Sequence, residues 1–130
     1  MHDVANIGVP FHGEFTSADA SALDETNSRM SLYGPGSVTA VTLDSNDQVI
    51  ITDLKVIAGS ALTVTIYDGG NTTVAAGERI DLSNFGANGG VFEGMTTPHY
   101  CQKGTYPKVK TSGAGQIDVQ IRGRIRRIGS

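Results

Sequence analysis

The chain has 130 residues, 17 glycines, one cysteine, no tryptophan and a formal net charge of −3. This length fits a single domain, and a charged fraction of 18% is too low for a long helical bundle. The single cysteine excludes a disulfide within the chain. No apolar run reaches the roughly 20 residues that cross a bilayer. We therefore expect no membrane partner, and the absence of a basic, apolar leader predicts synthesis in a cytosol.

Residues 1–33 show no sustained hydrophobic period. Apolar residues are sparse, and residues 17–29 are polar and rich in Ala and Ser, with Ser17 placed to cap one short helix over residues 18–23. We predict an extended N-terminal arm and linker over residues 1–37, which gains its order from a neighbouring molecule. Residues 38–130 are predicted to form one β-sandwich domain.

A period of two, which is typical of β-strands, begins at residue 38. The clearest early case is residues 62–67, where Leu62, Val64 and Ile66 alternate with polar residues before an Asp-Gly-Gly-Asn turn. The expected strand segments are 38–43, 49–57, 62–67, 72–76, 79–82, 91–93, 99–102, 108–111 and 117–125, with 49–57 central and covered on both faces. We predict an all-β fold: a single antiparallel β-sandwich of about eight strands, jelly-roll-like in type.

The last strand carries an arginine stripe. Ile117, Val119, Ile121 and Ile125, with Gly123 among them, share one face, and Arg122, Arg124 and Arg126 share the other. Guanidinium groups in a row suit the capture of carboxylates or phosphates. An isoelectric point of about 5.5 and the absence of aromatic residues on this strand argue against nucleic acid. We expect an acidic protein partner or an adjacent protomer, with a merely solvated stripe as the alternative.

Charge is also divided along the chain. The first 60 residues carry eight acidic and two basic residues, whereas residues 61–130 carry five acidic and eight basic residues. Such opposed ends suit contacts between neighbouring copies or docking on a charged surface, although an ordinary solvated surface is the favoured interpretation.

His99 and Cys101 are the strongest candidates for metal or nucleophile chemistry. Zinc needs three or four ligands, and residues i and i+2 of a strand lie about 6–7 Å apart, which is too far for most Cys–His contacts. The glycine clusters match no phosphate-binding pattern, and no G-x-S-x-G elbow occurs. We therefore predict that both residues serve packing, and that the protein is not an enzyme and has no catalytic residue, metal or cofactor.

Three segments, VTLDSNDQVIITDLKVIAG, LTVTIYDGG and VAAGERI, precede a Pro-containing loop at residues 97–104 and the final alternating strand. In this order of alternating segments and turns, residues 38–128 resemble the β-sandwich of capsid decoration (cement) proteins of tailed bacteriophages. Receptor-binding, head-fibre and carbohydrate-binding sandwiches share the same pattern.

The resemblance implies a homotrimeric structural protein that binds the major capsid protein on the outer surface of an icosahedral capsid. It implies stabilisation of the shell by clamping of neighbouring capsid subunits, and a place on the virion exterior after synthesis in the host cytoplasm. On this hypothesis the capsid or protomer contacts are Ile7, Val9, Phe11 and Phe15 in the arm, and Arg122, Arg124 and Arg126. The alternative is a phage fibre or carbohydrate-binding module used in host attachment, although the lack of tryptophan counts against a sugar site.

Overall fold

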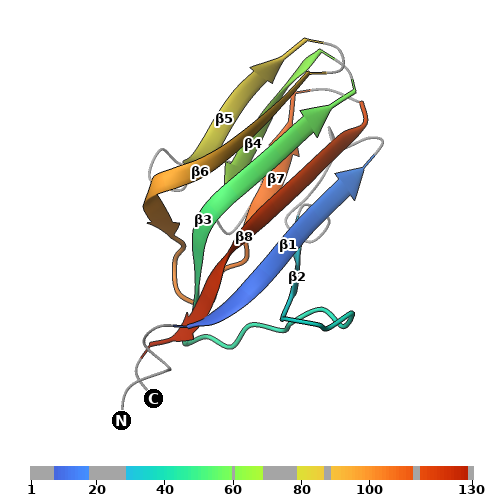
Figure 1. Cartoon of the computed structure of the whole chain (residues 1–130). Coiled ribbons are helices and arrows are strands. Elements are labelled where there is room, and N and C mark those ends of the chain that lie inside the picture. The colour runs from blue at the N-terminus through green and yellow to red at the C-terminus, as the bar shows by residue number, and fades with distance from the viewer. Residues whose placement is uncertain are drawn as a thin grey trace.

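A computed structural model describes residues 8–17, 29–59, 61–68, 79–86, 89–112 and 115–128. These residues form eight strands and no helix, which confirms the predicted all-β fold (Figure 1). No helix among them is long and apolar enough to cross a membrane. The strands are β1 (Val9–Ser17), β2 (Ser31–Tyr33), β3 (Asp47–Ala58), β4 (Leu62–Tyr67), β5 (Arg79–Phe85), β6 (Gly89–Tyr100), β7 (Lys108–Thr111) and β8 (Ile117–Arg127).

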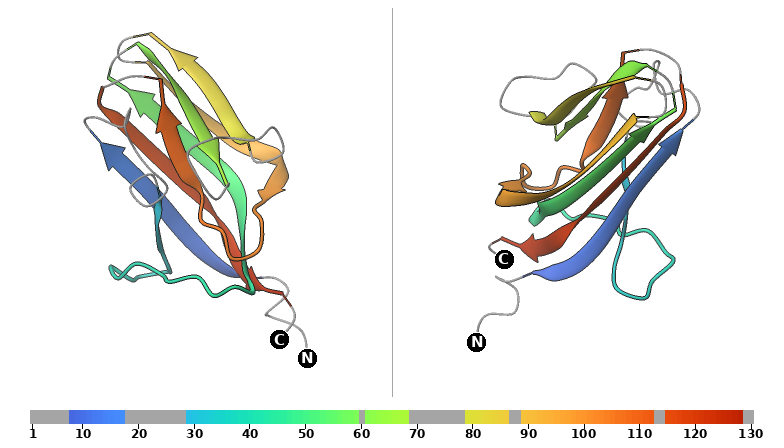
Figure 2. Two further views of the ribbon diagram at one scale, coloured as in Figure 1. Left: turned by 180° about the vertical axis from the view of Figure 1, so that it is seen from behind. Right: turned by 45° about the horizontal axis from the view of Figure 1, so that its top comes forward.

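The strands form two antiparallel sheets, of order β2-β1-β8-β3-β6 and β5-β4-β7. Their pairing is nested: β1 pairs with β8, β3 with β6 and β4 with β5, and a bridge between Arg29 and Lys108 joins the segment before β2 to β7. A long hairpin wound in this way gives a jelly-roll-like β-sandwich. The three-stranded sheet lies behind the larger sheet in Figure 1, and the right-hand view of Figure 2 shows the two layers.

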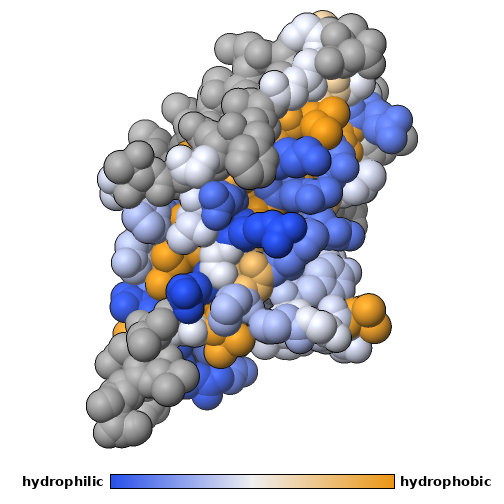
Figure 3. Space-filling view, viewed as in Figure 1, coloured by the Kyte–Doolittle hydropathy of each residue, from blue (hydrophilic) through white to orange (hydrophobic). Residues whose placement is uncertain are grey.

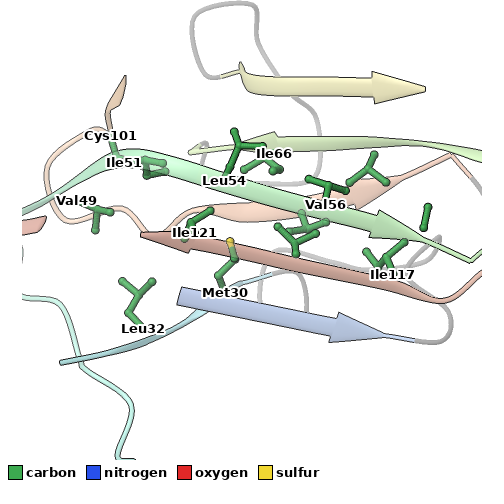
Figure 4. Close-up of a cluster of buried hydrophobic side chains, with 14 of the residues drawn as sticks. Met30, Leu32, Val49, Ile51, Leu54, Val56, Ile66, Cys101, Ile117 and Ile121 are labelled. Atoms are coloured by element: carbon green, nitrogen blue, oxygen red, sulfur yellow. The ribbon is translucent and has the colours of Figure 1, made fainter. Parts of the chain in front are cut away.

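One hydrophobic cluster contains residues of both sheets (Figure 4). β4 and β8 bury the residues that the alternation predicts: Leu62, Val64, Ile66, Ile117, Val119 and Ile121. Tyr67, which the alternation places on the other face, is also buried, because the register with β5 shifts between Ile66 and Tyr67. Burying each such aliphatic side chain contributes about 1.5–3 kcal/mol relative to its exposed state. The cluster is therefore what holds the two sheets together.

Most strand predictions after residue 47 agree with the structure. β4 and β7 match residues 62–67 and 108–111, and β3 is central, since it pairs with β8 and with β6. One face of β3 is less covered than expected, because Ile57 is 41% exposed. The residues predicted as two strands, 91–93 and 99–102, lie largely in the single strand β6. The predicted helix at 18–23 and the predicted strand at 72–76 lie outside the described residues.

Residues 38–43 differ from the prediction. They form no strand, and the only β-type contact here is a bridge between Tyr33 and Ala40. The chain leaves the sheet after β2 and turns at Gly36, so the apolar alternation of 38–43 has no neighbouring strand along which to pair.

The predicted arm is the larger difference. β1 pairs with β8 along its whole length, from Val9↔Ile125 to Ser17↔Ile117, and β2 pairs with β1. Residues 9–17 and 31–33 are therefore strands of the five-stranded sheet and not parts of an arm. Their order comes from a strand about 100 residues later in the same chain, a long-range pairing that local sequence patterns do not reveal.

The sequence of β1 has no clear period of two because a glycine stands at position 13. Phe11, Gly13 and Phe15 occupy alternate positions, but glycine interrupts the apolar face that the pattern requires. The glycine is nevertheless needed, because a Cβ at position 13 would lie 2.7 Å from Cγ1 of Ile121 and 2.9 Å from Cδ2 of Leu32.

β3 and β8 approach each other closely in the middle of the sheet. Their register shifts between Ile51 and Asp53, so Thr52 is the extra residue of a β-bulge. Gly123 lies opposite Ile51, and a Cβ at this glycine would overlap the carbonyl oxygen of Ile50. This glycine is therefore required by the close approach of two backbones and not by a turn.

Candidate functional site

The outer face of the five-stranded sheet carries the arginine stripe. Among the described residues, the three-stranded sheet covers only the opposite face, so the side chains that alternate with the core on β8 point outward. Arg122 and Arg124 are exposed, and Arg126 is half-buried. Figure 3 views this face and shows hydrophilic residues across its middle. The predicted arrangement of β8, with apolar and cationic residues on opposite faces, is confirmed.

The three arginines of the stripe differ in their contacts. Nε of Arg126 donates a hydrogen bond to Oε1 of Gln48 at 3.0 Å, and its guanidinium lies 5.3 Å from the centre of the Tyr100 ring. Within the described parts of the chain, Arg122 and Arg124 make no side-chain hydrogen bond and no ion pair. These two guanidinium groups can therefore bind an external carboxylate or phosphate without losing an internal partner.

Arg127 is a further cation at the end of β8, and it is engaged within the molecule. Its Nε lies 3.2 Å from Oδ1 of Asp47, and its Nη2 lies 2.5 Å from Oδ2 of Asp44. The hydrogen bond that it donates to Asp47 is the main cause that raises the pKa of Arg127 above its ordinary value. These contacts tie the turn before β3 to β8, so Arg127 has a structural role.

A groove of about 610 Å³ lies beside Arg122. It is lined by β1, by Tyr33 and by the loop that follows β2. His12 and Glu14 also line it, with 3.4 Å between Nε2 of the imidazole and Oε2 of the carboxylate. Small-molecule sites have volumes of about 300–1,000 Å³. The groove thus combines a cation, an imidazole, a carboxylate and a phenol ring in a space of suitable size.

The loop of residues 34–44 extends from the sandwich beside this groove (Figure 1). It turns at Gly36, whose φ of +68° favours glycine, and the N–H of Ser37 donates to the carbonyl oxygen of Gly34 at 3.2 Å. Val38 in this loop is 95% exposed and also lines the groove. An apolar side chain thus lines the same groove as Arg122.

The structure separates the four apolar residues predicted as anchors. Phe11 is 5% exposed and belongs to the core, and Phe15 packs against the same cluster. Val9 is 54% exposed, and Ile7 lies outside the described residues. Phe11 and Phe15 therefore stabilise the sandwich, and of the anchors that the structure describes Val9 is the most exposed.

His99 and Cys101 lie near each other and near a third residue that the sequence did not single out, Asp68. One potential ligand atom of each residue lies within 4.8 Å of those of the other two. Nε2 of His99 is 3.4 Å from Oδ2 of Asp68, and the N–H of Gln102 donates to that same oxygen at 2.9 Å. Asp68 stands before two glycines and was interpreted only as a turn residue, so no local signal connected it with residues about 30 positions later.

Cys101 is almost completely buried, with 1% of its surface exposed. Burial, with the nearby carboxylate of Asp68, raises the pKa of the Cys101 thiol above its ordinary value, while Lys108 acts in the opposite direction. In the molecule as described, this thiol is therefore protonated at neutral pH and unreactive as a nucleophile.

Comparison with known protein families and with curated proteins gives no match for this chain.

Proposed function

We propose that this protein binds the outer surface of an icosahedral viral capsid and stabilises the shell by contacting neighbouring capsid subunits. In this proposal it is a structural protein of the virion, assembled as a homotrimer and without catalytic activity. The resemblance in alternating segments and turns suggests the function. The observation that carries it is the face of the five-stranded sheet opposite the three-stranded sheet, where Arg122 and Arg124 are exposed beside a projecting loop and, within the residues that the structure describes, make no side-chain hydrogen bond or ion pair.

The free arginines suit a protein surface that carries acidic residues. A guanidinium binds a carboxylate through two parallel hydrogen bonds, and Arg122 and Arg124 project from the same face of β8. Val38, on the neighbouring loop, adds apolar area to the same contact. Each exposed ion pair contributes only about 0.2–1 kcal/mol, but three linked copies that engage together gain avidity. A modest contact in each protomer is therefore sufficient for stable attachment.

The contact that clamps neighbouring subunits is assigned to a different segment from the one that the sequence suggested. Phe11 is buried in the core and Phe15 is partly buried against it, so both side chains are engaged within the sandwich. We assign the clamp instead to the loop of residues 34–44, which reaches beyond the body of the sandwich (Figure 1).

Co-sedimentation with a panel of undecorated icosahedral phage capsids tests the proposal. We expect the wild-type chain to bind one of these capsids and to run as a trimer in light scattering. The double variant Arg122→Gln/Arg124→Gln should bind at least tenfold more weakly. A matched control, Lys103→Gln/Lys110→Gln, removes the same charge at two other exposed positions and should bind like the wild type.

Two results would contradict the proposal in different ways. Equal binding by both double variants would show that the arginine face is not the contact. If the wild-type chain binds none of the capsids, the proposed function itself is refuted.

The groove beside Arg122 supports a second candidate, a carbohydrate-binding module used in attachment. Tyr33 offers an aromatic ring to a sugar, and His12, Glu14 and Arg122 offer polar groups that can bind hydroxyl or carboxylate groups. A glycan array with the wild type and with Tyr33→Ala tests it. Binding that Tyr33→Ala abolishes, without binding to capsids, would favour this second function.

A further inference from the structure

Three potential metal ligands meet at one end of the sandwich. Asp68 follows β4 of the three-stranded sheet, His99 lies near the end of β6 of the five-stranded sheet, and Cys101 follows β6. Their carboxylate, imidazole and thiol groups are the three ligand types that zinc uses in proteins. We propose that Asp68, His99 and Cys101 bind one zinc ion, which links the two sheets.

The distances fit tetrahedral coordination. With zinc bonds of about 2.0–2.2 Å to nitrogen and oxygen, a tetrahedral angle places these two ligand atoms about 3.3–3.5 Å apart. Nε2 of His99 and Oδ2 of Asp68 are 3.4 Å apart. The longer zinc–sulfur bond of about 2.3 Å requires the sulfur about 3.6 Å from the other two ligand atoms. One potential ligand atom of each residue lies within 4.8 Å of those of the other two, so the approach of the sulfur to about 3.6 Å is a movement on the order of 1 Å.

An unsatisfied oxygen points to a missing ligand in the same place. Asp68 is 2% exposed, and its Oδ1 makes no hydrogen bond within the described part of the chain. A buried polar atom without a partner costs about 1–3 kcal/mol. Its other oxygen, Oδ2, lies 3.4 Å from Nε2 of His99 and also accepts the N–H of Gln102, and this hydrogen bond fixes the orientation of the carboxylate. A zinc ion that contacts both carboxylate oxygens would remove the cost.

The charges also balance. A zinc ion bound by one thiolate, one carboxylate and one neutral imidazole has no net charge, so burying it does not require a further counter-ion. Binding releases the thiol proton of Cys101 to solvent, and the positive charge of Lys108 nearby favours the thiolate that forms. Lys108 is itself 4% exposed and has an interaction of its own.

The site has an entrance and an open position. The side chain of His99 is 22% exposed, whereas Cys101 and Asp68 are buried, so a metal ion would reach the cluster from the His99 side. Three protein ligands leave the fourth tetrahedral position to a water molecule. The proposed site is independent of the capsid-binding function, since it involves none of the residues of the arginine face.

Metal binding to the purified full chain tests the proposal. After treatment with a chelator and dialysis, the protein receives Zn²⁺ alone or Co²⁺ alone. We expect one metal ion per chain and, with Co²⁺, a thiolate-to-cobalt charge-transfer band in the near ultraviolet. Because the chain has a single cysteine, this band reports coordination by Cys101 and by no other residue.

Variants identify the other ligands. His99→Gln should weaken Zn²⁺ binding by more than about 100-fold, because even the loss of an outer contact weakens metal sites by about 10–100-fold. Asp68→Asn should weaken it as well. His12→Gln, which removes another partly exposed histidine, is the matched control and should bind like the wild type. Circular dichroism establishes that each variant is folded.

Absence of the charge-transfer band from the wild type would overturn the proposal, and this outcome does not depend on any variant. Zinc affinity that is unchanged in folded His99→Gln would overturn it equally. Loss of the band in His99→Gln, with retention in His12→Gln, would support it.

Discussion

Gly123 provides the sharpest test of how β3 and β8 are packed. A Cβ at this position would overlap the carbonyl oxygen of Ile50 and would lie 2.9 Å from the Ile50 carbonyl carbon and 3.1 Å from Cα of Ile51. These are backbone atoms of a strand that is hydrogen-bonded on both sides, so they cannot rotate away as a flexible side chain would. Gly123→Ala therefore has to displace a section of β3 or of β8.

The structure sets the expected size of this effect. Overpacking a well-packed site costs about 1–3 kcal/mol and occasionally more, and a clash with paired backbone belongs at the upper end. We expect Gly123→Ala to lower the free energy of unfolding by about 3 kcal/mol or more. For a chain of this length, that corresponds to a fall in Tm of about 10 °C.

Urea unfolding followed by circular dichroism measures the effect, with Gly86→Ala as the control. Gly86 has no atom within 4 Å of an added Cβ, so its alanine variant should stay within about 0.5 kcal/mol of the wild type. A loss of less than about 1 kcal/mol in Gly123→Ala would refute the close approach of the two strands.

Three further predictions concern single side chains. Tyr106→Phe removes the hydroxyl oxygen that accepts a hydrogen bond from the N–H of Leu43 at 2.8 Å. It should lower the free energy of unfolding, measured in urea, by about 1–2 kcal/mol, and an unchanged value would contradict this hydrogen bond. Ile66→Ala should cost about 3 kcal/mol because Ile66 is fully buried, whereas Ile57→Ala, at a site that is 41% exposed, should cost much less in the same assay. In chelator-treated protein, the raised pKa of the Cys101 thiol keeps it protonated in the folded state, whereas the thiol of the unfolded chain ionises above about pH 8.5. The unfolding free energy should therefore fall above that pH by up to about 1.4 kcal/mol per pH unit. Cys101→Ala should lack this contribution to the pH dependence.

The strands that sequence reasoning found are those with an uninterrupted local pattern. Leu62, Val64 and Ile66 alternate without a break, as do Ile117 and Val119, and both segments are strands with the predicted faces. The sequence of β1 does not indicate a strand, because Gly13 interrupts its apolar face and because its partner β8 lies about 100 residues away. A periodic pattern reports which face is buried, but it does not report which distant strand supplies the partner.

The same distinction applies to the candidate sites. Alternation predicts Arg122, Arg124 and Arg126 on one face, but only the structure shows that Gln48, 78 residues earlier, binds Arg126, while the other two have no such contact with any described residue. The proposed zinc ligands were only partly visible. His99 and Cys101 are close in sequence, but Asp68 joins them only because β4 and β6 finish at the same end of the sandwich.

The nested pairing has a consequence for the synthesis of the protein. β8 lies between β1 and β3, yet about 100 residues separate the end of β1 from the start of β8, which takes about 5–20 s to translate. Until β8 is made, β1 and β3 each lack the strand that pairs with one of their two edges, and unpaired strand edges are sites of aggregation. The complete five-stranded sheet therefore forms only after β8 has left the ribosome. The yield of folded protein should depend on chaperones that bind β1 and β3 before then.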